Sequence, residues 1–136
     1  MPQRDTPETF LREANIAILS TVGPGGGPHA APIWFDYEDG EIVMITGARS
    51  QKARNIERNP EVALTVDHRS PPYYAVMVQG TAELGPRPSD ELRRCIAVRY
   101  LGEELGQRYT SMGTGEGTVT IRLRPRKIME YKSSGR

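Results

Sequence analysis

The chain has 136 residues, long enough to bury a core, and we expect one domain over residues 1–136. The formal net charge of +1 gives no overall reason to expect a nucleic acid as partner. No apolar run approaches the roughly 20 residues that span a bilayer, so no membrane association is expected. The N-terminal residues are polar, unlike a signal peptide, and the single cysteine suits a reducing compartment. These features predict a cytoplasmic protein.

The N-terminal segment predicts a short helix. Thr6-Pro7-Glu8 is typical of a helix start, because a hydroxyl cap, a proline in the first turn and an acidic residue all suit a helix N-terminus. We expect this helix to run to about Ala14 and to turn Phe10, Leu11 and Ala14 toward the core.

Apolar patterns and turn residues predict six or seven strands with short connections. A glycine-rich turn at residues 23–27 and the Asp39-Gly40 pair predict two early chain reversals. Pro32 indicates an edge strand or a bulge, and Gly80 indicates a bulge or a point of close approach. The expected strands are residues 16–22, 29–37, 42–46, 62–66, 73–83 and 118–123, with a short seventh at 128–131 after an interruption at Pro125.

Two further helices are predicted, at residues 50–58 and 89–102, and residues 103–112 add a second helical turn or two. In the helix after Ser89, Leu92, Ile96 and Tyr100 share one face, and we expect Cys95 to be a small buried apolar residue. Short-connected antiparallel strands with helices outside them predict a mostly β (α+β) fold built as a small barrel.

Residues 46–55 are the strongest candidate for an anion site. A strand ends at Thr46 and a helix opens at Ser50, where free N–H groups and the helix dipole attract phosphate. Arg49 and Lys52 place full positive charges at the same end. The alternative is a surface helix whose charges are simply solvated.

The segment around Trp34 is the candidate for binding a flat ring. Pro32 leaves backbone groups unpaired beside Ile33 and Trp34, which offers a heteroaromatic ring both stacking area and partners at its rim. The alternative is that Trp34 belongs to the core.

Together these features resemble the split β-barrel flavoprotein family related to pyridoxamine 5′-phosphate oxidase. The resemblance is strongest to its small branch of deazaflavin (coenzyme F420)-dependent reductases. It rests on the runs Ile18-Leu19-Ser20-Thr21, Pro32-Ile33-Trp34-Phe35, Ser50-x-Lys52-Ala53-Arg54-Asn55-Ile56, Arg58-Asn59-Pro60 and Val76-x-Val78-x-Gly80.

The resemblance implies an antiparallel split β-barrel of six or seven strands and a homodimer with cofactor sites at its interface. It also implies a phosphate site at Ser50 and Lys52, with Arg49 and Asn55 near it. The ring would be lined by Pro32, Ile33, Trp34, Ile45 and Thr46, with Gln79 and Gly80 on a strand facing it and residues 128–131 reaching the partner's cofactor.

The implied activity is transfer of hydride from reduced coenzyme F420 to a small unsaturated or aromatic acceptor. This chemistry belongs to the cofactor, so no catalytic side chain or metal is predicted. F420 is favoured over FMN because Arg54 and Arg58 exceed what one phosphate needs. The alternatives are an FMN-binding oxidase or flavin reductase, and a non-catalytic carrier of flavin, deazaflavin or haem.

Overall fold

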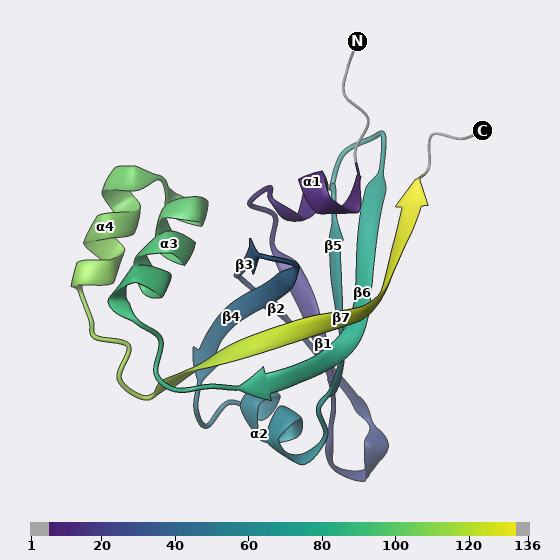
Figure 1. The fold of residues 1–136 in the computed structure, drawn as a ribbon, viewed down its shortest axis with the longest axis horizontal. Coiled ribbons are helices and arrows are strands. Elements are labelled where there is room, and N and C mark those ends of the chain that lie inside the picture. The colour runs from purple at the N-terminus through teal and green to yellow at the C-terminus, as the bar shows by residue number, and fades with distance from the viewer. Residues whose placement is uncertain (1–5, 133–136) are drawn as a thin grey trace.

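The computed structural model describes residues 6–132, which form one strongly curled antiparallel sheet with helices at its ends and along one side (Figure 1). The seven strands of these residues lie in the order β2-β1-β5-β6-β7-β4-β3. The strands are β1 (Ala17–Val22), β2 (Pro28–Ile33), β3 (Phe35–Glu38), β4 (Glu41–Gly47), β5 (Glu61–Asp67), β6 (Tyr74–Leu84) and β7 (Thr118–Lys132). The helices are α1 (Pro7–Leu11), α2 (Gln51–Arg58), α3 (Asp90–Leu101) and α4 (Glu103–Ser111), with a 3-10 turn at Pro24–Gly26. The predicted fold class, a mostly β split barrel with flanking helices, is confirmed.

The split in the barrel lies between β2 and β3, which are the two edges of the sheet although only Trp34 separates them in the chain. The prediction of one strand over residues 29–37 was therefore wrong. The N–H of Phe35 donates to the Tyr100 hydroxyl (3.1 Å), so a side chain of α3 satisfies this backbone donor at the point where β2 ends and β3 begins. The edge position predicted from Pro32 is confirmed, because β2 pairs only with β1.

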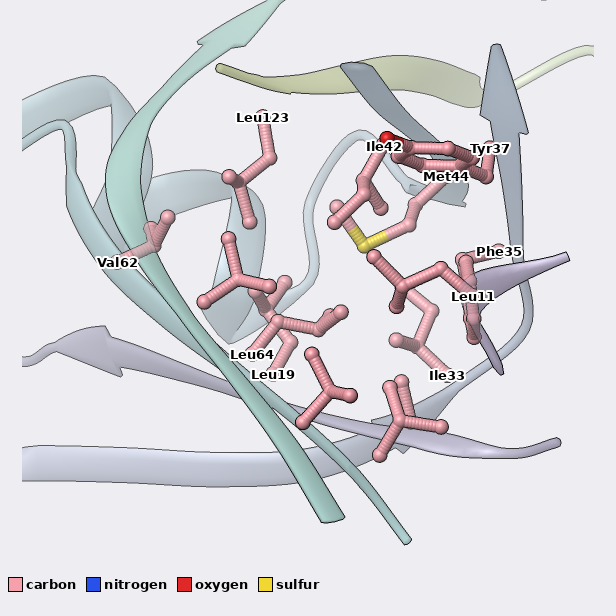
Figure 2. Close-up of a cluster of buried hydrophobic side chains, with 14 of the residues drawn as sticks. Leu11, Leu19, Ile33, Phe35, Tyr37, Ile42, Met44, Val62, Leu64 and Leu123 are labelled. Carbon is pink, nitrogen blue, oxygen red and sulfur yellow. The ribbon is translucent and has the colours of Figure 1, made fainter. Parts of the chain in front are cut away.

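The core fills the curl of the sheet, and two helices close its ends (Figures 1 and 2). Phe10 and Leu11 of α1 enter from one end, and Ile56 of α2 enters from the other. Each fully buried side chain of this size contributes about 1.5–3 kcal/mol relative to an exposed one. The strands contribute the labelled residues Leu19, Ile33, Phe35, Tyr37, Ile42, Met44, Val62, Leu64 and Leu123.

Helix α1 is shorter than predicted, since it ends at Leu11 and leaves Ala14 exposed. The reason lies in Arg99, whose guanidinium donates to the carbonyl oxygens of Leu11 (2.9 Å), Arg12 (3.0 Å) and Glu13 (2.7 Å). Because these carbonyls are satisfied from α3, the chain can leave the helix at this point.

The bulge predicted at Gly80 is present, whereas the break predicted at Pro125 is not. Strand β7 runs without interruption from Thr118 to Lys132, and its register against β6 shifts between Gln79 and Gly80. A Cβ atom at Gly80 would collide with the β7 backbone at Arg124. The shift leaves Pro125, which has no N–H to give, opposite this glycine inside a continuous strand.

Helices α3 and α4 form a hairpin that packs beside β3 (Figure 1). Gly106 permits their close approach, because a Cβ there would lie 2.5 Å from the Val98 Cα. Cys95 is exposed on α3, so the prediction that it is buried was wrong; Ile96 and Ala97 are buried instead. Within residues 6–132 no helix is long and apolar enough to cross a membrane.

Candidate cofactor site

The start of α2 forms the end of the barrel where β4 stops. Ser50 is the N-cap, and its Oγ accepts from the backbone N–H of Ala53 (3.1 Å) and from the hydroxyl of Thr46 (3.1 Å). The N–H groups of Gln51 and Lys52 have no acceptor within the helix, as expected for its first turn. Two predicted site residues, Thr46 and Ser50, are thus in direct contact beneath two free backbone donors.

Two cations stand at this helix end without a partner. Within the described part of the chain, Arg49 is exposed, Lys52 is half-buried, and neither makes a hydrogen bond or an ion pair. No acidic residue occurs in the first turn of α2. Positive side chains at the positive end of a helix are unfavourable by up to about 1 kcal/mol, an arrangement that a bound anion would reverse.

Asn55 is not at the surface. Its side chain is fully buried, and its Nδ2 donates to Thr21 Oγ1 on β1 (2.9 Å). Its Oδ1 accepts from Gln51 (2.7 Å) and from Arg58 (3.1 Å). Asn55 therefore ties α2 to the barrel, a role that the pattern of the sequence did not reveal.

The two additional arginines of α2 are held by neutral acceptors of the protein. Arg58 also donates to the Val22 carbonyl (3.1 Å), and Arg54 donates to Gln51 (2.7 Å). Both side chains stay exposed, but the argument that they are surplus charges reserved for a longer anionic cofactor is weakened.

Four of the predicted ring-lining residues meet in one hollow of about 300 Å³. It is lined by Pro32, Ile33, Trp34 and Ile45, together with Ile16 and Tyr109. Thr46 points to the opposite face of β4 from Ile45, into the barrel, and so joins the Ser50 end of the site instead. We call this space the ring hollow.

The ring hollow lies at the split of the barrel, where two strand edges are free. Strand β4 pairs with β3 only from Glu41 to Met44, which leaves residues 45–47 unpaired on that side. Strand β2 is unpaired along its outer edge. Backbone donors and acceptors therefore flank an apolar hollow, and β4 leads directly from it to Thr46 and the α2 start.

Two tyrosines of the α3–α4 hairpin complete the site and were missed as site residues. Tyr100 stacks on Trp34 with ring centroids 4.9 Å apart and planes 8° from parallel, while its hydroxyl donates to the Asn15 carbonyl (2.8 Å). Tyr109 lies 6.0 Å from Trp34 and is 54% exposed. The sequence predicted that Tyr100 lies on one face of a helix, but no sequence signal linked that face to Trp34, which is 66 positions earlier.

Gln79 and Gly80 are not near the ring hollow within one chain. Gln79 lies on the outer face of β6, and Pro32 lies on the same face of β2. Strands β1 and β5 separate them, which corresponds to about 14 Å at the usual strand spacing. Residues 128–131 belong to the second half of β7, beyond the bulge.

Comparison with known proteins identifies the family. A model of the pyridoxamine 5′-phosphate oxidase family matches residues 4–132. The 5a,11a-dehydrotetracycline/5a,11a-dehydrooxytetracycline reductase of Streptomyces rimosus is 38% identical over 99% of this chain and 87% of its own length. The solved structure of an F420 reductase is 27% identical with a TM-score of 0.78, covering 93% of this chain and 98% of that one. A conserved hypothetical protein from Mycobacterium tuberculosis is 26% identical with a TM-score of 0.77, covering 98% and 91%. The chain therefore belongs to the pyridoxamine 5′-phosphate oxidase family.

Proposed function

We propose that this protein is a reductase that uses reduced coenzyme F420 to deliver hydride to a small unsaturated or aromatic acceptor. One observation carries the proposal: β4 leads from an apolar hollow at the barrel split to a helix start with two cations that have no partner among the described residues. A flat ring joined to a phosphate has the same division into an apolar part and an anionic part. The relatives named as a tetracycline-type reductase and an F420 reductase support the same chemistry.

The residues present fit such a cofactor. Lys52, Arg49 and the first-turn N–H groups of α2 would bind the phosphate, with the Ser50 hydroxyl beside them. Pro32, Trp34 and Ile45 would contact the ring, and the free edge of residues 45–47 would offer hydrogen bonds at its rim. Asn55 would act indirectly, by fixing α2 against β1.

When bound, the reduced deazaflavin supplies the hydride. The protein's part is to hold the ring face against the acceptor and to exclude water. Trp34 is well placed for this part, since Tyr100 fixes it by stacking and by a bond to the adjacent backbone.

We favour F420 over FMN because a solved F420 reductase shares the fold over nearly its whole length. FMN stays the second candidate, because the family model is that of pyridoxamine 5′-phosphate oxidase. A cytoplasmic location belongs to the same proposal.

We further propose a homodimer in which the outer faces of β1, β5, β6 and β7 meet. This face carries Ile18, Thr65, Met77 and Met129, one beside the next across the sheet, all half-buried. The helices of residues 6–132 lie at the barrel ends and beside β3 rather than over this row (Figure 1). A second copy would cover the row and could bring its own Gln79 and Gly80 toward the ring hollow.

Titration of the purified protein with F420, FMN and haem tests the proposed function, followed by turnover with reduced F420 and a panel of quinones, nitroaromatics and enones. We expect micromolar or tighter binding of F420 and oxidation of its reduced form by at least one acceptor. Tight binding of FMN in preference to F420 would favour the flavin enzyme. Tight binding without any turnover would favour a carrier.

A further inference from the structure

A second pocket adjoins the ring hollow on the side of the α3–α4 hairpin, with a volume of about 240 Å³. It shares Trp34, Ile45 and Tyr109 with the ring hollow. It is also lined by Ile96 and Ala97, which are buried, and by Arg93, Gly115 and Thr118. We call it the helical pocket.

We propose that the helical pocket binds the acceptor, a planar conjugated carbonyl compound such as a quinone or an enone, with its oxygen toward Arg93. The inference rests on the proposed reductase function and names the substrate class of that site. Hydride transfer requires the reacting atoms to approach within about 3–3.5 Å. An acceptor must therefore lie against the bound ring. The helical pocket is positioned for this contact, because it shares three lining residues with the ring hollow.

The size and lining of the pocket restrict the acceptor. An apolar cavity of about 150 Å³ is enough for benzene, so about 240 Å³ suits one substituted ring or two fused rings. The isoleucine, alanine and two aromatic side chains in its lining favour a flat apolar body. A larger polycyclic compound would enter with one end only.

Arg93 supplies the polar contact. Its Nη2 donates to the carbonyls of Thr110 (3.0 Å) and Gly113 (3.0 Å), and its Nη1 donates to Asp90 (3.3 Å). Of its five N–H groups, the one on Nε and the second on Nη1 have no acceptor among residues 6–132. The three bonds hold the guanidinium in place, and the remaining donors suit a carbonyl oxygen.

The same contact would assist the reaction. Hydride adds to the β-carbon of the conjugated C=C bond, and the π electron pair moves onto the carbonyl oxygen, where the guanidinium stabilises the negative charge. Water then protonates the α-carbon. The acceptor gains two electrons and two protons in total: the hydride from the proposed reduced deazaflavin carries both electrons and one proton, and water gives the second proton.

Binding to the cofactor-free protein tests the pocket without relying on turnover. Trp34 is the only tryptophan, so quenching of its fluorescence reports an occupant beside it. The probe is menadione, a two-ring conjugated dione, and methylnaphthalene is its counterpart without carbonyl groups. Ala97→Leu fills the helical pocket without lining the ring hollow, whereas Cys95→Leu places the same side chain on the exposed face of α3.

We expect saturable quenching by menadione in the wild type, at least tenfold weaker binding in Ala97→Leu, and no change in Cys95→Leu. Ala97→Met, with a more flexible side chain, provides the same comparison if the leucine variant does not fold by circular dichroism. Arg93→Lys should remove most of the preference for menadione over methylnaphthalene. Equal menadione binding in the wild type and in the folded pocket-filling variant would overturn the proposal that the acceptor binds in the helical pocket. An unchanged preference for menadione in Arg93→Lys would overturn the proposal that Arg93 binds the carbonyl oxygen.

A separate titration with F420 distinguishes the two proposals. Binding of F420 within twofold of the wild type in Ala97→Leu, with loss of menadione binding, supports both. A wild type that binds menadione at the pocket but does not bind F420 overturns the proposed cofactor alone.

Discussion

Replacing Asn55 by alanine separates a residue that supports the site from one that binds the ligand. Asn55 stands within a motif that implies a phosphate ligand, yet its side chain is fully buried and bonded to Thr21, Gln51 and Arg58. We therefore expect Asn55→Ala to lower the stability of the fold, and to weaken cofactor binding only through displacement of α2.

The expected loss of stability follows from the hydrogen bond that each partner of Asn55 loses. Thr21 is 2% exposed, and leaving its hydroxyl without a buried partner costs about 1–3 kcal/mol. Gln51 and Arg58 can turn to water, so their bonds add little. With a small cavity included, we expect a loss of about 2–3 kcal/mol. For a domain of this size that corresponds to a Tm lower by about 6–12 °C.

Differential scanning calorimetry and urea unfolding measure the change. Asn59→Ala is the matched control, because its side chain accepts one exposed backbone bond from Glu61 (3.0 Å) and its loss should cost less than about 1 kcal/mol. If Asn55→Ala kept the wild-type Tm but lost cofactor affinity, Asn55 would be a direct ligand and our account of it would be refuted.

Three further changes test other parts of the structure. Tyr100→Phe keeps the stacking on Trp34 but removes the hydrogen bonds of the hydroxyl at the barrel split. The free energy of unfolding should therefore fall by about 1–2 kcal/mol, and the fluorescence emission maximum of Trp34 should shift. Unchanged emission would contradict the role of Tyr100 in fixing Trp34. Gly80→Ala should destabilise by more than about 2 kcal/mol in urea unfolding because its Cβ meets the β7 backbone, whereas Gly47→Ala, with open space around it, should change stability by less than about 1 kcal/mol. Met77→Glu places a charge on the proposed dimer face and should convert a dimer of about twice the chain mass into a monomer in light scattering, and a dimer that persists would place the interface elsewhere.

Local signals in the sequence predicted most of the fold. The alternation of Val62, Leu64 and Val66, and the caps at Ser50 and Ser89, depend only on neighbouring residues, and the structure contains the corresponding strand and helices. The break at Trp34 and the early end of α1 could not be predicted, because both depend on side chains of α3 that are distant in sequence.

The residues of the candidate site also divide into those that local sequence could predict and those that depend on distant parts of the chain. Residues 32–34 and Ser50 belong to short segments whose residue types already indicate a ring and an anion, whereas Ile45 was implied only by the family resemblance. The structure brings residues 32–34 and Ile45 into one hollow. Asn55 resembles a ligand in sequence, but its surroundings are set by Thr21 on another strand. The contributions of Tyr100 and Arg93 arise from the packing of the α3–α4 hairpin, which no local pattern specifies.

The most direct test of the central claim is the affinity of the Lys52→Ala variant for F420, measured by fluorescence titration. Lys52 has no partner in the described residues, so its removal should leave the Tm unchanged while deleting one charge-assisted contact to phosphate. A contact of this kind is worth about 1.5–3 kcal/mol, so we expect binding about 10- to 100-fold weaker. Arg69→Ala, which removes one positive charge from the β5–β6 connection at the end of the barrel opposite α2 (Figure 1), should bind F420 as the wild type does. Wild-type affinity in Lys52→Ala, or an equal loss in Arg69→Ala, would contradict a phosphate site at the start of α2.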